Sequence, residues 1–266
     1  MPAAPEPVLL TPAEHVQRLA VAMERFTAAL AKADLAAPVP GCPGWDVADL
    51  GSHLGGVHRW ARGAIVEGHP GVDPGDGPRE RDALVAWYRE GADDLLDTLN
   101  TADPADPCWS FGPKPSRVAF WCRRQDHETW MHLWDARSAK AGAAAGAAAD
   151  ADPTAGSALI EPVLAADGLD ETAAMFFPRQ VRLRRIGPLA RSLALEPTDA
   201  AGRWVLAGDG TGPAGAPDAA AEATVRGPAE ALLLLLWKRA APTDPRIAAA
   251  GDPDALGSVL AEAITP

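Results

Sequence analysis

SRVAFWCRRQDHETWMHLWDARSAKAGAAA, residues 116–145, is the segment most indicative of the architecture. The pattern predicts a helix from about Ser116 to about Ala145 that buries one face, because apolar residues recur along it at helical spacing. These apolar residues are Val118, Trp121, Cys122, Trp130, Leu133 and Trp134. A helix with one buried face needs other elements to pack against.

Three further helices are predicted before it. Residues 11–14 read TPAE, a capping box with proline at the first helical position. Asp46 is the expected N-cap of a second helix, with Asp49 at N3. A third helix is expected over about Glu80–Leu99, after a Gly-, Pro- and Asp-rich connection at residues 68–77. Four amphipathic helices with one long middle connection predict a four-helix bundle.

The pattern changes after the alanine- and glycine-rich stretch at residues 139–153. Alternating segments there predict strands, and two apolar segments predict helices. The expected strands are 191–196, 203–207 and 223–226, and the expected helices are 229–239 and 254–264. We therefore expect two domains, a helical one over residues 1–148 and an α+β one over residues 153–266.

Composition excludes several classes of protein. The chain has 266 residues, with 24 basic and 36 acidic side chains and a net charge of −12, which argues against nucleic-acid binding. No segment reaches the roughly 20 apolar residues of a membrane helix, and the first residues lack a secretory pattern. Three cysteines without a C-x-x-C pair suit a reducing compartment. We expect a cytoplasmic protein without membrane or nucleic-acid partners.

Residues 126–135, DHETWMHLWD, carry the candidate chemistry. Glu128 and His132 are four apart on the predicted helix, so both can bind one ion, whereas His127 projects roughly 100° away. A third ligand must come from a facing helix, and His53 in LGSHLGG is the best candidate. Two histidines and one glutamate form a catalytic zinc pattern. Asp135 is placed to hold the second imidazole nitrogen of His132.

The spacing alone leaves a plainer interpretation open, in which Glu128 is a solvated helix residue and His132 a satisfied core histidine. His58 has either a surface or packing role or a place in the ligand pocket, and Trp130 and Trp134 are candidates for walls of the site because they flank His132. Among the remaining residues, Cys42 is expected to be an inert, buried turn cysteine. Trp45 is expected to be a hydrophobic staple before Asp46.

Several motifs resemble those of the mycothiol-dependent maleylpyruvate isomerase family. They are CPGWDVADL at residues 42–50, SHLGG at 52–56, HETWMHLWD at 127–135, ADGLDE at 166–171 and GPAEALLLLLW at 227–237. The resemblance covers nearly the whole chain in the family's order. It implies a DinB-like four-helix bundle followed by a small α+β domain related to sterol-carrier folds.

The same resemblance implies a divalent metal, zinc, held by His53, Glu128 and His132, with the thiol mycothiol bound nearby. The metal would stabilise the reactive thiolate by lowering the pKa of the thiol. In an isomerase the thiolate adds to an electron-poor cis double bond, and in a thiol transferase the adduct is the product. A maleylpyruvate-like dicarboxylate would need arginine partners. Arg226 is the first candidate, and a solvated strand end is its alternative interpretation.

Two other classes of function remain open on these residues. One is a non-catalytic metal- or ligand-binding protein, or a regulatory one, on the same fold. The other is a metal-dependent hydrolase that uses zinc-bound water. For the enzyme, the expected partners are a small electrophile and a low-molecular-weight thiol, in a monomer or small homo-oligomer.

Overall fold

The computed structural model describes residues 6–70, 75–140, 158–210 and 219–266. The chain divides into two compact units. One is Thr11–Pro153, and the other combines Met1–Leu10 with Thr154–Pro266. Residues 6–10 therefore group with the C-terminal part of the chain, whereas the sequence pattern places them in the helical domain.

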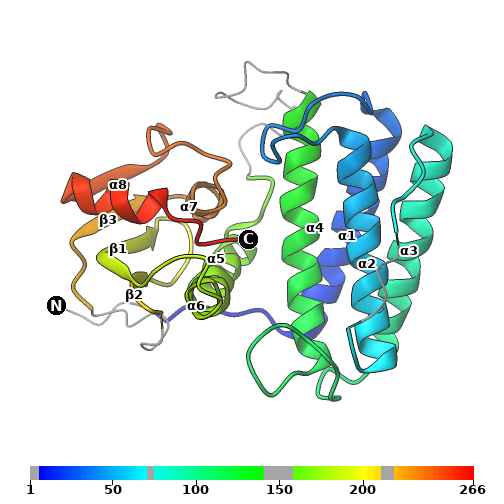
Figure 1. The fold of residues 1–266 in the computed structure, drawn as a ribbon, viewed down its shortest axis with the longest axis horizontal. Helices are drawn as coiled ribbons and strands as arrows, with labels where there is room; N and C mark the ends of the chain where they lie inside the picture. Colours follow the sequence, from blue (N-terminus) through cyan, green and yellow to red (C-terminus); the bar gives the residue numbers. More distant parts are fainter. Residues whose placement is uncertain (1–5, 71–74, 141–157, 211–218) are drawn as a thin grey trace. The chain divides into compact units, whose positions relative to one another are not determined.

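The unit that follows Leu10 contains four long helices (Figure 1). They are α1 (Pro12–Lys32), α2 (Val47–Glu67), α3 (Arg81–Thr101) and α4 (Val118–Lys140). The predicted helical bundle is confirmed. α4 begins two residues later than predicted, and its expected end at residues 141–145 lies outside the described residues.

Local signals explain where these helices begin. Thr11 and Glu14 form the capping box of α1, and Asp46 and Asp49 form that of α2, so each pair satisfies backbone N–H groups at its helix start. The Glu80 side chain accepts hydrogen bonds from two backbone N–H groups at the start of α3. Capping thus fixes the start of α2 at Val47, six residues before His53.

The bundle core is apolar and aromatic. α1 packs against α3 and α4, and α2 packs against the same two helices. Fully buried side chains come from every helix, including Phe26, Leu54, Tyr88 and Trp121. Because α2 and α4 are in direct contact, side chains from both can meet at one site.

The other unit contains a small sheet with strand order β2-β1-β3-β4. β1 (Leu189–Pro197) pairs antiparallel with β2 (Trp204–Gly208) and parallel with β3 (Ala223–Gly227), and β4 (Ala248–Gly251) pairs antiparallel with β3. The three predicted strands correspond to β1, β2 and β3, which confirms the α+β class. β4 is an addition to the prediction.

Helices accompany this sheet. α7 (Ala229–Leu236) and α8 (Pro253–Ala261) correspond to the two predicted helices and end three residues earlier than predicted. α5 (Pro162–Glu171), a π-helical turn (Thr172–Phe176) and α6 (Phe177–Arg182) form a segment that the sequence pattern did not predict. The Leu10 N–H donates to Asp167 Oδ2 on α5 at 2.9 Å, which ties the start of the chain to this unit. Among the described helices, none has the length and apolar character required to cross a membrane.

Candidate metal centre

Three potential ligands meet between α2 and α4. His53 Nε2 and His132 Nε2 each lie 3.3 Å from Glu128 Oε1. The three donor atoms fall within 4.8 Å of one another, a cluster in which one metal ion could be held. Glu128 and His132 share a face of α4 because they are four residues apart, and His53 enters from the facing helix.

The Glu128 carboxylate has a separate partner for each oxygen. Its Oε2 accepts a hydrogen bond from Arg124 Nη2 at 2.9 Å, which leaves Oε1 facing the two imidazoles. Burial opposes ionisation of Glu128, but hydrogen bonds and charge from His132, His53 and Arg124 hold the pKa of its carboxyl well below the usual value. Glu128 is therefore anionic at neutral pH, as a metal ligand must be.

His132 is oriented by a buried carboxylate. Its Nδ1 lies 3.0 Å from Oδ2 of Asp135, which is fully buried. Because a carboxylate only accepts hydrogen bonds, Nδ1 carries the proton and Nε2 faces Glu128. Burial lowers the pKa of His132, but Asp135, Cys42 and Glu128 together raise it well above the usual value. In the absence of a metal, His132 is thus a protonated partner of two carboxylates.

Cys42 has more contacts than an inert turn cysteine. It is half-buried, and its Sγ donates to Asp135 Oδ2 at 3.5 Å, the same oxygen that faces His132. The expectation that Cys42 is buried is therefore wrong, and its inertness stays a prediction. The contact spans 93 positions in the sequence, so it depends on the turn before α2 closing onto α4.

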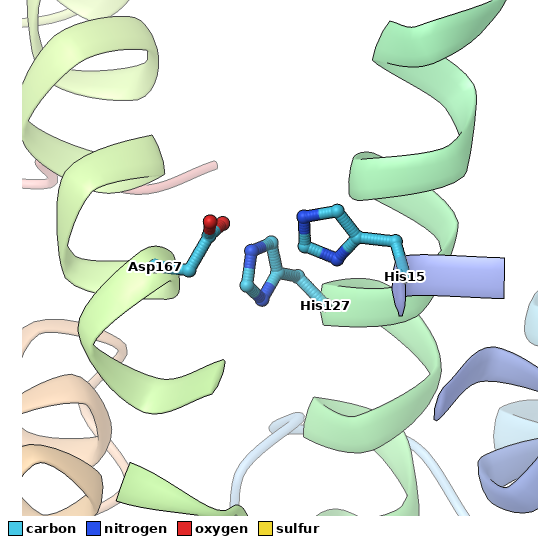
Figure 2. Close-up of side chains that lie close together, drawn as sticks. All are labelled: His15, His127 and Asp167. Atoms are coloured by element: carbon cyan, nitrogen blue, oxygen red, sulfur yellow. The ribbon is translucent and has the colours of Figure 1, made fainter. Parts of the chain in front are cut away.

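His127 lies apart from the three ligands. Its ring is 5.5 Å from that of His15 on α1, in an edge-on arrangement, and Figure 2 shows the two imidazoles side by side. His15 Nδ1 also lies 2.8 Å from Asp126 Oδ2. Helical geometry explains this separation, because His127 and Glu128 project in different directions from α4.

The other expected pocket residues occupy different places. His58 is fully buried, with Nε2 at 3.1 Å from Thr129 Oγ1, and desolvation by burial lowers its pKa to about 3. Trp130 is buried beneath Arg25, whose guanidinium lies 5.4 Å from the ring centroid, and Trp134 is half-buried. Arg226 is an exposed residue of β3 in the other unit.

A cavity of about 630 Å³ adjoins His53. Its lining residues within α2 and beside it include Trp45, Asp49, Ser52 and Trp60. The Trp45 ring lies 4.8 Å from the His53 ring and 6.4 Å from the His132 ring, so Trp45 belongs to the site. Sequence reasoning assigned it only a staple role. Trp45 lies four residues before Asp49, in the CPGWD segment next to the His53 motif. This position was the sequence signal for a role of Trp45 at the site.

Both units match family profiles. Residues 16–137 match the mycothiol maleylpyruvate isomerase N-terminal domain, and residues 163–258 match the C-terminal domain of the same family. The chain belongs to the mycothiol-dependent maleylpyruvate isomerase family. The family resemblance of the sequence motifs is thereby confirmed, as is the order of a helical and an α+β part.

Solved structures of this family share the fold. A crystal structure of the mycothiol-dependent maleylpyruvate isomerase aligns with a TM-score of 0.58 over 91% of this chain and 95% of that chain, at 13% identity. A structure described as a histidine-to-alanine mutant of the isomerase aligns with the same values. At this identity the likeness establishes the fold. No significant match was found among curated protein sequences.

Proposed function

We propose that this protein is a zinc-assisted, mycothiol-dependent isomerase or thiol transferase that acts on a small, electrophilic, maleylpyruvate-like substrate. The observation that carries the proposal is the convergence of His53, Glu128 and His132 within a domain of this family. The solved structure with the same fold is described as mycothiol-dependent.

The donor set suits a divalent metal. Two imidazole nitrogens and one carboxylate oxygen are the ligands of many catalytic zinc sites, which keep a fourth position for water or substrate. Asp135 supplies the carboxylate that zinc-binding histidines commonly require behind the ring. When bound, zinc would lower the pKa of a thiol and so favour the nucleophilic thiolate at neutral pH.

The chain's own residues would prepare this site in three ways. Arg124 holds one oxygen of Glu128, so that the other stays directed at the imidazoles. Asp135 keeps the proton of His132 on Nδ1 and frees Nε2 for a ligand role. His53 is the most exposed of the three ligands, with 35% of its side chain accessible, and it lies at the cavity from which a thiol would approach.

The metal assignment can be tested on the purified full chain. We expect about one zinc per chain in the wild type, as for a three-ligand catalytic site, and a sharp loss in His53→Ala and His132→Ala. His69→Ala is the matched control, because His69 is an exposed histidine of the loop after α2. Full zinc retention in both ligand variants would refute the assigned set.

The thiol assignment needs a second measurement. Calorimetric titration with mycothiol should show binding to the zinc-loaded protein and little binding to the metal-free protein. Equal binding to both forms would exclude a thiol that is activated at the metal. Zinc-dependent binding without turnover of any electrophile would instead indicate a ligand-binding protein on the same fold.

A further inference from the structure

The unit that contains the sheet has a cavity of about 450 Å³, which the proposed function does not use. Among the described residues that line this cavity, the two charged ones, Glu161 and Asp199, are both acidic. Asp199 Oδ1 accepts the Ala229 N–H at 2.8 Å, which holds this carboxylate in place. The other lining residues are apolar, namely Val8, Pro162, Val163, Ala166, Ala200 and Ala201. This acidic cavity therefore suits an occupant that combines an apolar side chain with positive charge.

The same unit presents such a combination at the end of α6. Residues 182–185, here called the arginine turn, read RLRR. Leu183 is 45% exposed, and the arginines on both sides of it are exposed as well. Within the described part of the chain, Arg182, Arg184 and Arg185 pair with no carboxylate. The arginine turn thus presents one apolar and three cationic side chains to the solvent.

Backbone hydrogen bonds fix the shape of the arginine turn. The Arg184 N–H donates to the Val181 carbonyl at 2.9 Å, and the Arg185 N–H donates to the Gln180 carbonyl at 3.0 Å. This is the Schellman pattern of a helix end. Arg184 has a φ of 56°, a left-handed conformation in which glycine is the usual residue. The chain therefore keeps a guanidinium at a position where glycine would fit the backbone better.

The arginines of this segment also repel one another. Burial and the charges of Arg185 and Arg182 lower the pKa of Arg179, which lies one helical turn before Arg182. Like charges held this close are destabilising, and carboxylates of a partner would relieve the repulsion. The acidic residues of the cavity have the required sign of charge.

We propose that the arginine turn of one copy of this chain docks into the acidic cavity of a second copy. Leu183 enters among the apolar lining residues, and the neighbouring guanidiniums face Glu161 and Asp199. Because the arginine turn is exposed, it does not fill the cavity of its own chain. The two surfaces differ, so the contact is head-to-tail. It requires neither zinc nor thiol, and its test is therefore independent of the proposed function.

Sedimentation equilibrium of the full chain tests this contact. The salt concentration should be about 0.15 M, because a Debye length of about 8 Å then screens the long-range repulsion between copies of net charge −12. We expect the wild type to self-associate. Leu183→Asp should weaken association at least about tenfold, as for the loss of a central apolar anchor, and Ala200→Arg should do the same by adding bulk and positive charge to the cavity. Val21→Asp is the matched control, because Val21 is 42% exposed on α1 in the other unit, and it should associate like the wild type.

Mixing the two variants identifies the surfaces that meet. Leu183→Asp keeps an intact cavity, and Ala200→Arg keeps an intact arginine turn. At concentrations where each variant alone is monomeric, the mixture should form a one-to-one pair that grows no further, because its remaining turn and cavity are both blocked. A mixture that stays monomeric overturns the proposal, and so does self-association that both variants retain. A wild type that is monomeric up to about 1 mM also overturns it and leaves the cavity to a different cationic occupant.

Arg184→Gly separates association from folding stability. Glycine suits the left-handed backbone at this position, so the variant should have a higher thermal unfolding midpoint than the wild type. The same substitution removes one guanidinium and should weaken self-association. Association equal to that of the wild type would contradict the proposed charge pairing.

Discussion

Replacing Asp135 with asparagine should weaken zinc binding about 10- to 100-fold, the usual effect of losing the carboxylate behind a metal-bound histidine. The structure supports a value in this range because Asp135 is fully buried and its Oδ2 lies 3.0 Å from His132 Nδ1. The amide keeps the shape of the side chain but removes its charge, and its NH₂ group can face Nδ1 and disfavour the required tautomer. The loss corresponds to about 1.4–2.8 kcal/mol.

The dissociation constant for zinc can be measured by competition with a chromogenic chelator at fixed pH. Asp126→Asn is the matched control, because Asp126 is also buried on α4 and its Oδ2 lies 2.8 Å from the Nδ1 of another histidine, His15. It should leave zinc affinity within about twofold of the wild type, the scatter expected of a residue outside the ligand shell. Unchanged affinity in Asp135→Asn, or equal weakening in both variants, would refute the orienting role of Asp135.

Three further predictions concern stability. Lowering the pH from 7 to 5 should reduce the free energy of unfolding by about 2 kcal/mol through His58. The folded pKa of His58 is about 3, below the unfolded value near 6.5, so the unfolded state takes up the proton first. Urea unfolding of His58→Gln should show a pH dependence that is smaller by this amount. Gly55→Ala should lower the free energy of unfolding by about 1–3 kcal/mol, because the added Cβ would lie 2.3 Å from the Trp87 side chain. Gly257→Ala in α8 is the control, because a Cβ there has no neighbouring atom within 4 Å. It should be neutral or stabilising in the same assay. Zinc at 100 times its dissociation constant should stabilise the wild type by about 2.7 kcal/mol, and thermal unfolding of His132→Ala should show no such gain.

Local signals in the sequence were sufficient for the helix starts of the bundle and for two of the three candidate ligands. The capping residues Thr11 and Asp46 mark the starts of α1 and α2, as observed. The four-residue spacing of Glu128 and His132 places both on one face of α4 whatever the rest of the fold does. Choosing His53 as the third candidate also required the assumption that α2 faces α4. The two helices do pack against each other.

Long-range contacts explain what the sequence did not reveal. Trp45 reaches His53 because the Val39 N–H donates to the Trp45 carbonyl and closes the preceding turn. The contact of Cys42 with Asp135 likewise joins distant segments. β4 consists of alanine and glycine, which have little strand preference, and pairing with β3 overrides that preference.

The grouping of residues up to Leu10 with the C-terminal unit has a consequence for synthesis. The bundle is contiguous in sequence and can begin to fold once Thr11–Pro153 has left the ribosome. The other unit is split in sequence, because the bundle lies between its two segments. The Leu10 N–H can donate to Asp167 only after Asp167 has been synthesised. A fragment that starts at Thr154 would therefore leave this acceptor without its backbone donor, and residues 6–10 supplied as a separate peptide are the natural complement.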